Sequence, residues 1–96
     1  MFVIILKFSV NKSQAGTYMS GHTAWLERGF DEGVFLLAGT IQPGLGGALF
    51  AHNASLSDLQ SRISDDPFVA QEVVSAEILE ITPGQTIERL DFLLDV

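Results

Sequence analysis

The feature that most constrains the fold is the N-terminal segment 2–10, which is rich in β-branched and aromatic residues. Such a segment is typical of a β-strand, whose alternate side chains point to opposite faces. Val3 and Ile5 lie on one face. The other face is apolar along its whole length, with Phe2, Ile4, Leu6, Phe8 and Val10. A strand that is apolar on both faces has to be covered on both sides.

The length of 96 residues predicts a single domain over 1–96, with one core. A composition of 47% hydrophobic residues, with a mean hydropathy of +0.31, indicates apolar surface that a partner subunit covers. The chain has no cysteine, which excludes disulfides and thiolate metal sites. The first apolar run is short and lacks the flanking features of a signal peptide or a membrane span, so we expect a cytoplasmic protein with no membrane partner.

The charge balance argues against a nucleic-acid partner. Five basic and twelve acidic residues give a net charge of −7, and the basic residues are scattered along the chain. Binding to phosphates needs clustered cationic side chains. The acidic excess instead favours solubility.

The remaining pattern alternates helical and strand periodicity, with turns marked by glycine and proline. Two β-α-β halves joined by right-handed crossovers predict an α+β, ferredoxin-like βαββαβ sandwich: an antiparallel four-stranded sheet with two helices on one face. The predicted core covers 1–82 and a C-terminal tail covers 83–96. The predicted elements are a strand over 2–10, a polar loop over 11–21, a helix over 20–32, strands over 34–41 and 47–52, a helix that begins at 55 and is interrupted at 65–68, a strand over 73–81, and a tail segment over 87–94 that is either strand or helix.

Helices on one face of the sheet would leave Val3 and Ile5 bare on the other. The simplest cover is a second copy of the same sheet. We therefore expect a homodimer that forms through the sheet faces.

His22 is the most informative polar residue. Trp25, Leu26, Gly29 and Phe30 follow it at helical spacing, so His22 heads the apolar stripe of its helix and points toward the sheet. A buried imidazole needs a hydrogen-bond partner. A carboxylate partner would orient the ring and make it a general base near neutral pH. A histidine at the edge of the core, bonded to a backbone carbonyl, is the commoner arrangement on spacing alone.

Asp66 precedes Pro67 at the predicted end of the second helix, since proline disfavours helical geometry in the residue before it. A carboxylate at such a break can reach across the side of the domain that faces the sheet. A plain helix stop with solvated Asp65 and Asp66 explains the same residues.

The remaining motifs give weaker evidence for a catalytic or binding site. His52 ends a strand, where histidine is more often exposed. Metal binding is not expected, because two histidines 30 residues apart form no ligand motif. Glycines 44, 46 and 47 precede a strand, whereas anion binding needs a following helix, so they indicate a hairpin turn.

The order of these motifs resembles the YCII-related family of small dimeric α/β-barrel proteins, over about residues 1–82. The motifs are FVIIL in the first strand, GHTAWLERGFDEG around His22, FLLAG at 35–39, the glycine-rich turn and DPFV at 66–69. The resemblance implies a ferredoxin-like fold whose sheets pair face to face in a dimer, and an active site centred on His22 and Asp66. It also implies cofactor-free chemistry on chlorinated or hydroxylated aromatic rings or related lactones. Family members often have an arginine shortly before the histidine, where this chain has YMSG at 18–21.

Two functional hypotheses follow. In the first, the chain is a small cofactor-free enzyme in which a His22/Asp66 dyad transfers protons, in an isomerase-like or lyase-like reaction. Its substrate would be a small, aromatic molecule in a pocket lined by Trp25, Phe8 and Phe50. In the second, the chain is a non-catalytic dimer that binds a small ligand or docks onto another enzyme, which the missing arginine and the high apolar content favour.

Overall fold

In the computed structural model, which describes residues 1–94, four strands form one antiparallel sheet in the order β2-β3-β1-β4. The central strand β1 pairs with both β3 and β4. This order, with helices on one face, is the ferredoxin-like α+β fold, so the predicted fold class is confirmed. The strands are β1 (Phe2–Phe8), β2 (Phe35–Ile41), β3 (Gly46–Ala51) and β4 (Val74–Glu80).

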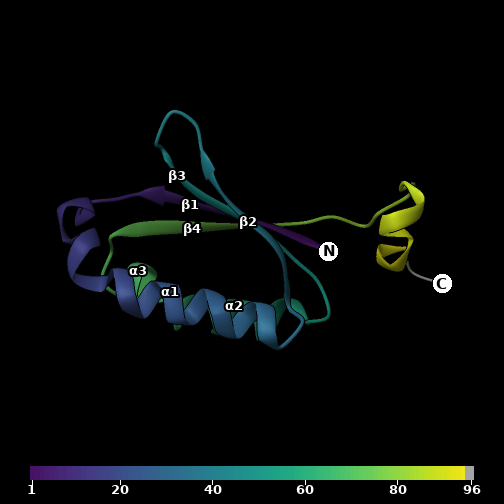
Figure 1. Cartoon of the computed structure of the whole chain (residues 1–96), viewed down its shortest axis with the longest axis horizontal. Helices are drawn as coiled ribbons and strands as arrows, with labels where there is room; N and C mark the ends of the chain where they lie inside the picture. The colour runs from purple at the N-terminus through teal and green to yellow at the C-terminus, as the bar shows by residue number, and fades with distance from the viewer. Residues whose placement is uncertain (95–96) are drawn as a thin grey trace.

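Three α-helices lie on the same side of this sheet (Figure 1). The short helix η1 precedes the first of them, and η2 lies in the tail. Residues 95 and 96 of the predicted tail lie outside the described residues. The helices are η1 (Lys12–Gln14), α1 (Ala15–Asp31), α2 (Leu56–Ser64), α3 (Pro67–Ala70) and η2 (Glu88–Leu93).

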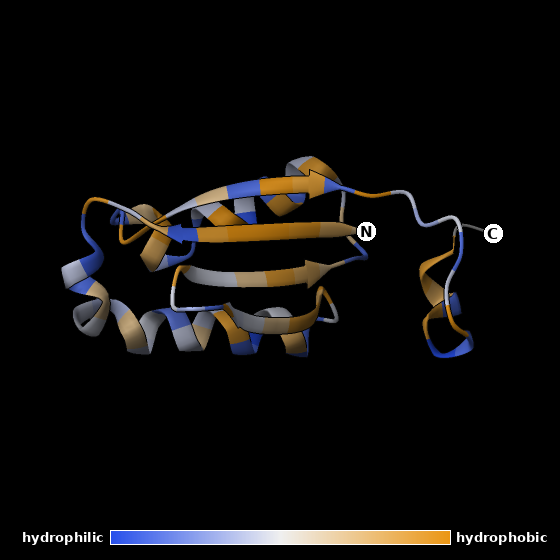
Figure 2. Cartoon of the chain, turned by 90° about the horizontal axis from the view of Figure 1, so that it is seen from above, coloured by the Kyte–Doolittle hydropathy of each residue, from blue (hydrophilic) through white to orange (hydrophobic). Residues whose placement is uncertain are grey.

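The two faces of β1 differ in their surroundings, as the sequence predicts. Phe2, Ile4 and Leu6 are buried in the core beneath the helices. Val3 and Ile5 are half-buried and lie on the face that the helices leave open. Figure 2 looks onto this open face and shows β1 as a hydrophobic stripe across it.

The open face carries further apolar side chains around Val3. Register places Phe50 of β3 and Leu79 of β4 on either side of Val3, and Leu37 of β2 beside Phe50. Leu37, Phe50 and Leu79 are all exposed in a single copy of the chain. Exposed apolar side chains that adjoin one another are typical of a surface that another molecule covers.

The structure differs from the sequence prediction in two helices. Helix α1 begins at Ala15, within the segment predicted as a polar loop, because Ala15 and Tyr18 pack against the core. A short helix α3 follows directly after the predicted helix stop, because Pro67 occupies its first turn and Asp66 is its N-cap. Proline therefore both ends α2 and begins α3.

Candidate active site

Helix α1 carries His22 close to α3. The preceding residue is Gly21, and a Cβ atom added there would lie 3.0 Å from the Pro67 ring. The missing side chain thus lets the two helices approach each other at the level of His22. The His22 side chain is 14% exposed.

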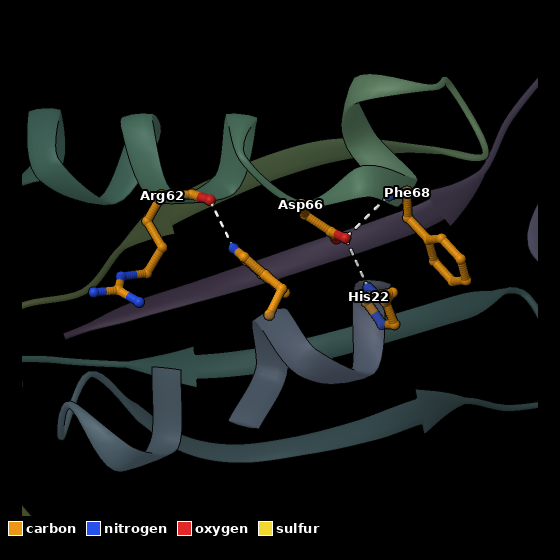
Figure 3. Close-up of polar contacts among 5 residues, drawn as sticks. His22, Arg62, Asp66 and Phe68 are labelled. Atoms are coloured by element: carbon orange, nitrogen blue, oxygen red, sulfur yellow. Dashed lines mark hydrogen bonds and ion pairs between the residues drawn. The ribbon is translucent and has the colours of Figure 1, made fainter. Parts of the chain in front are cut away.

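Asp66 is fully buried, with 0% exposure, at the N-terminus of α3. Its Oδ1 atom accepts a hydrogen bond from the Phe68 backbone N–H at 3.0 Å and lies 2.8 Å from Nδ1 of His22 (Figure 3). An ionised carboxylate can only accept, so Nδ1 of His22 carries the hydrogen of this bond. The neutral ring then has an unprotonated Nε2 atom, which can take up a proton.

Two aromatic side chains fix the plane of the imidazole. The Phe68 ring lies parallel to it, with 4.1 Å between centroids and 3° between planes. The Trp25 ring lies 5.8 Å away at 26°. Trp25 is itself held by a hydrogen bond from its Nε1–H to the Arg62 carbonyl at the end of α2, at 2.8 Å. The His22 ring is therefore oriented by its carboxylate partner and by its packing.

A cavity of about 500 Å³ lies beside His22, between α1 and the ends of β1 and β2. Its size is within the range of sites that bind small molecules. The polar side chains that line it are His22, Thr23 and Thr40. The remaining lining is apolar or glycine: Leu6, Phe8, Met19, Leu26, Ala38, Gly39, Gly44, Gly46, Gly47, Phe68 and Val74.

Of the three predicted pocket residues, the structure brings only Phe8 into this cavity. Trp25 is buried and stacks on His22, but it does not line the cavity. Phe50 lies on the open face of the sheet, because it pairs with Val3 rather than with a residue of the core face. Neither Trp25 nor Phe50 therefore lines this cavity, contrary to the sequence expectation.

His52 is also placed away from the cavity lining. Its ring lies edge-on to Phe92 of the tail, with 5.4 Å between centroids. Gly44 lies in the turn between β2 and β3, whereas Gly46 and Gly47 begin β3, and all three glycines line the cavity.

Sequence reasoning missed Phe68 as part of the site. The available signal was its position two residues after Asp66, where an N-cap aspartate accepts from the backbone of a residue in the first turn. The threonines of the lining, Thr23 and Thr40, had no comparable signal, since their placement depends on how the sheet packs against α1.

Within residues 1–94, no three His, Cys, Asp or Glu side chains gather as metal ligands. Across the same residues, no helix has the length and apolar character that crossing a membrane requires.

The fold and the site define a ferredoxin-like α+β protein in which a half-buried His22 contacts the buried Asp66 beside an apolar cavity. No family model matches the chain, and no curated protein matches it. A solved structure that resembles it is 5-chloro-2-hydroxyhydroquinone dehydrochlorinase (TftG) from Burkholderia phenoliruptrix AC1100, in complex with 2,5-dihydroxybenzoquinone. The TM-score is 0.69 at 16% sequence identity, and the match covers 88% of this chain and 96% of the other. At this identity the likeness establishes the fold.

Proposed function

We propose that the chain is a divergent YCII-related, cofactor-free enzyme that moves a proton on a small aromatic substrate. The observation that carries this proposal is the 2.8 Å contact between His22 Nδ1 and the buried Asp66 Oδ1, beside an apolar cavity. A carboxylate in this position holds the ring in one tautomer and stabilises the imidazolium that forms when the ring accepts a proton.

In the proposed reaction, Nε2 of His22 takes a proton from a hydroxyl or C–H group of the bound substrate. The electron pair left behind moves into the ring system of the substrate. In an isomerisation, the proton then returns to another atom of the substrate. In an elimination, the pair forms a new double bond while a leaving group such as chloride departs with the electrons of its own C–Cl bond, and His22 releases its proton to water. Elimination is included because the structural neighbour is a dehydrochlorinase.

The side chains that line the cavity suit an aromatic ring that carries polar substituents. Apolar side chains such as Phe8, Leu26 and Phe68 suit the faces of an aromatic ring. Thr23 and Thr40 provide hydroxyls that can donate to or accept from a ring substituent. Chlorinated hydroquinones are therefore the first compounds to test as substrates.

The tautomer of His22 provides the direct test of the dyad. In the wild-type protein we expect nitrogen NMR at neutral pH to show the proton of the neutral ring on Nδ1. In Asp66→Ala we expect the share of the tautomer with hydrogen on Nε2 to rise, because the Nδ1–H loses the oxygen that accepts from it. Any turnover should fall by roughly 10²–10⁴-fold, the usual contribution of acid–base catalysis.

The matched control is Asp65→Ala, which removes the carboxylate of the neighbouring, exposed aspartate. Its spectrum should equal that of the wild type. The same tautomer population in Asp66→Ala as in the wild type would show that the dyad does not control His22.

A non-catalytic binding protein is the second candidate. It is favoured by the N-cap role of Asp66, which gives the carboxylate a structural task without any chemistry. Native mass spectrometry separates the candidates: a co-purified ligand that is retained in His22→Ala, together with no turnover by the wild type, would indicate binding alone.

We also propose that the chain is a homodimer through the open sheet face. Sedimentation should give a mass near twice 10.4 kDa. Val3→Asp and Ile5→Asp should weaken association, because each places a charge in the apolar interface. Gln60→Asp, on the exposed surface of α2, should leave the mass unchanged. A monomeric wild type would overturn the proposed dimer.

A further inference from the structure

The tail of the chain exposes one apolar cluster. We call Ile87, Leu90 and Phe92 the tail cluster; their exposed fractions are 66%, 42% and 52%. The tail leaves the domain at Ile81, whose backbone pairs with Met1 in two hydrogen bonds of 2.9 Å. Figures 1 and 2 show η2 standing beyond the end of the sheet at which the N-terminus lies.

The entrance of the cavity exposes a second apolar cluster. We call Phe8, Val10, Met19 and Leu45 the mouth cluster. Phe8 and Met19 line the cavity, and the Phe8 N–H donates to the Leu45 carbonyl at 3.2 Å. All four side chains are exposed, and Val10 is 81% exposed. The cavity therefore opens through an apolar rim that a single copy of the chain leaves in contact with water.

The two clusters have charges of opposite sign beside them. The two lysines of the chain, Lys7 and Lys12, adjoin the mouth cluster in sequence, and Lys12 Nζ lies 4.7 Å from the centre of the Phe8 ring. Both lysines are exposed. The first turn of η2 presents Glu88 and Asp91, which are exposed and outnumber the one exposed base between them, Arg89. The chain as a whole has a net charge of −7. An acidic segment is therefore attracted to the basic rim rather than to the rest of the surface.

The tail cluster and the mouth cluster of one chain lie at opposite ends of the sheet, so they cannot contact each other. The mouth cluster surrounds the C-terminal end of β1, whereas the tail leaves beside its N-terminal end, and the molecule is 43 Å long. A second copy packed on the open sheet face changes this. If the two-fold axis runs across the strands, the partner's strands run in the opposite direction, so each tail end meets the other copy's mouth end.

We propose that the C-terminal tail of a second copy docks on the mouth cluster and covers the entrance to the cavity. This inference rests on the proposed homodimer. Each site is then completed by the partner subunit: the tail cluster packs on Phe8, Met19 and Leu45, and Glu88 and Asp91 face the two lysines. Covering the entrance excludes water from His22, which strengthens its hydrogen bond to Asp66.

Site-specific cross-linking tests this arrangement, because the chain has no cysteine of its own. Tagged Arg89→Cys protein is mixed with untagged Val10→Cys protein, the subunits are exchanged, and a short bismaleimide is added. Both positions are exposed, so neither change removes core packing. We expect a covalent species that carries one tagged and one untagged chain.

The control partner for Arg89→Cys is Gln60→Cys, on the exposed surface of α2, and this mixture should give no cross-link. The charge contribution is tested by Lys12→Glu in the Val10→Cys chain, which should reduce the yield. Asp91→Lys in the Arg89→Cys chain should restore part of it.

Sedimentation of the same samples separates the two proposals. A dimer that forms the tail-to-mouth cross-link supports the inference. A dimer in which Arg89→Cys fails to link to Val10→Cys, or links equally to Gln60→Cys, overturns the tail position and leaves the face-to-face dimer standing. A monomer overturns both. In each case the tautomer of His22 still decides the dyad independently.

Discussion

Replacing Asp66 by alanine should lower the free energy of unfolding by about 3 kcal/mol, the usual scale for breaking a buried polar pair. Two bonds are lost at once. His22 loses the acceptor that lies 2.8 Å from its Nδ1, and α3 loses the N-cap that accepts from Phe68. A lost N-cap alone costs roughly 0.5–2 kcal/mol, and a lost hydrogen bond to a charged group roughly 1.5–3 kcal/mol.

One gain offsets part of this loss, so the expected change in the free energy of unfolding is smaller than the sum of the two bond energies. The other carboxylate oxygen of Asp66, Oδ2, is buried and has no hydrogen-bond partner among the described residues. Burial of an unpaired polar atom costs free energy in the wild type, and alanine removes that cost. The loss of two bonds outweighs this gain, so the sign of the change remains destabilising.

Urea unfolding at fixed protein concentration provides the measurement, since the proposed homodimer would make stability depend on concentration. Asp65→Ala is the matched control, because Asp65 is exposed and its side chain forms no hydrogen bond among the described residues. It should change stability by less than about 0.5 kcal/mol. Equal stability of the Asp66→Ala and Asp65→Ala proteins would contradict the buried pair.

A double-mutant cycle then isolates the contact itself. His22→Ala should cost less in a protein that already carries Asp66→Ala than in the wild type, because the shared bond is lost only once. We expect a coupling of about 1–2 kcal/mol, within the range for residues in direct contact. Additive effects would indicate that the two side chains do not share a bond in solution.

The elements of this fold could be predicted because their signals are local. Alternation along β1 identified both its core face and its open face, and the apolar stripe beginning at His22 oriented α1 correctly. The helix that the sequence predicts to begin at residue 55 has Ser55 as its N-cap, and the Ser55 Oγ accepts from the Asp58 N–H at 3.1 Å. Turn residues marked the hairpin between β2 and β3.

The pocket could not be predicted in the same way. Phe8 and Phe50 are both aromatic residues on strands, and only the pairing register shows that Phe50 shares a face with Val3. A change of one position in register would move it to the opposite face. The early start of α1 was missed for a related reason, since Ala15 and Tyr18 are stabilised by packing against the core rather than by local propensity.

Gly46→Ala should be the most damaging small substitution at the cavity. Gly46 has a φ of +139°, which a residue with a side chain rarely adopts. A Cβ atom built there would lie 1.9 Å from the Leu6 backbone oxygen and 3.0 Å from the Lys7 Cα atom. Both atoms belong to the backbone of the central strand β1, which cannot move aside without breaking its pairing with β3.

We expect Gly46→Ala to lower the free energy of unfolding by about 3 kcal/mol, because backbone strain and overpacking each cost roughly 1–3 kcal/mol. The control is Gly39→Ala, which also adds one methyl group to a glycine of the cavity lining. No atom lies within 4 Å of the added Cβ at Gly39, and its φ is not in the positive range.

Gly39→Ala should therefore change the free energy of unfolding by less than about 1 kcal/mol, since alanine also reduces the freedom of the unfolded chain. The two variants differ from the wild type by the same atoms, so the difference between their urea midpoints measures the close approach of β3 to β1. If Gly46→Ala unfolds at the same urea concentration as Gly39→Ala, the glycine at the start of β3 is not required for the pairing that forms this wall of the cavity.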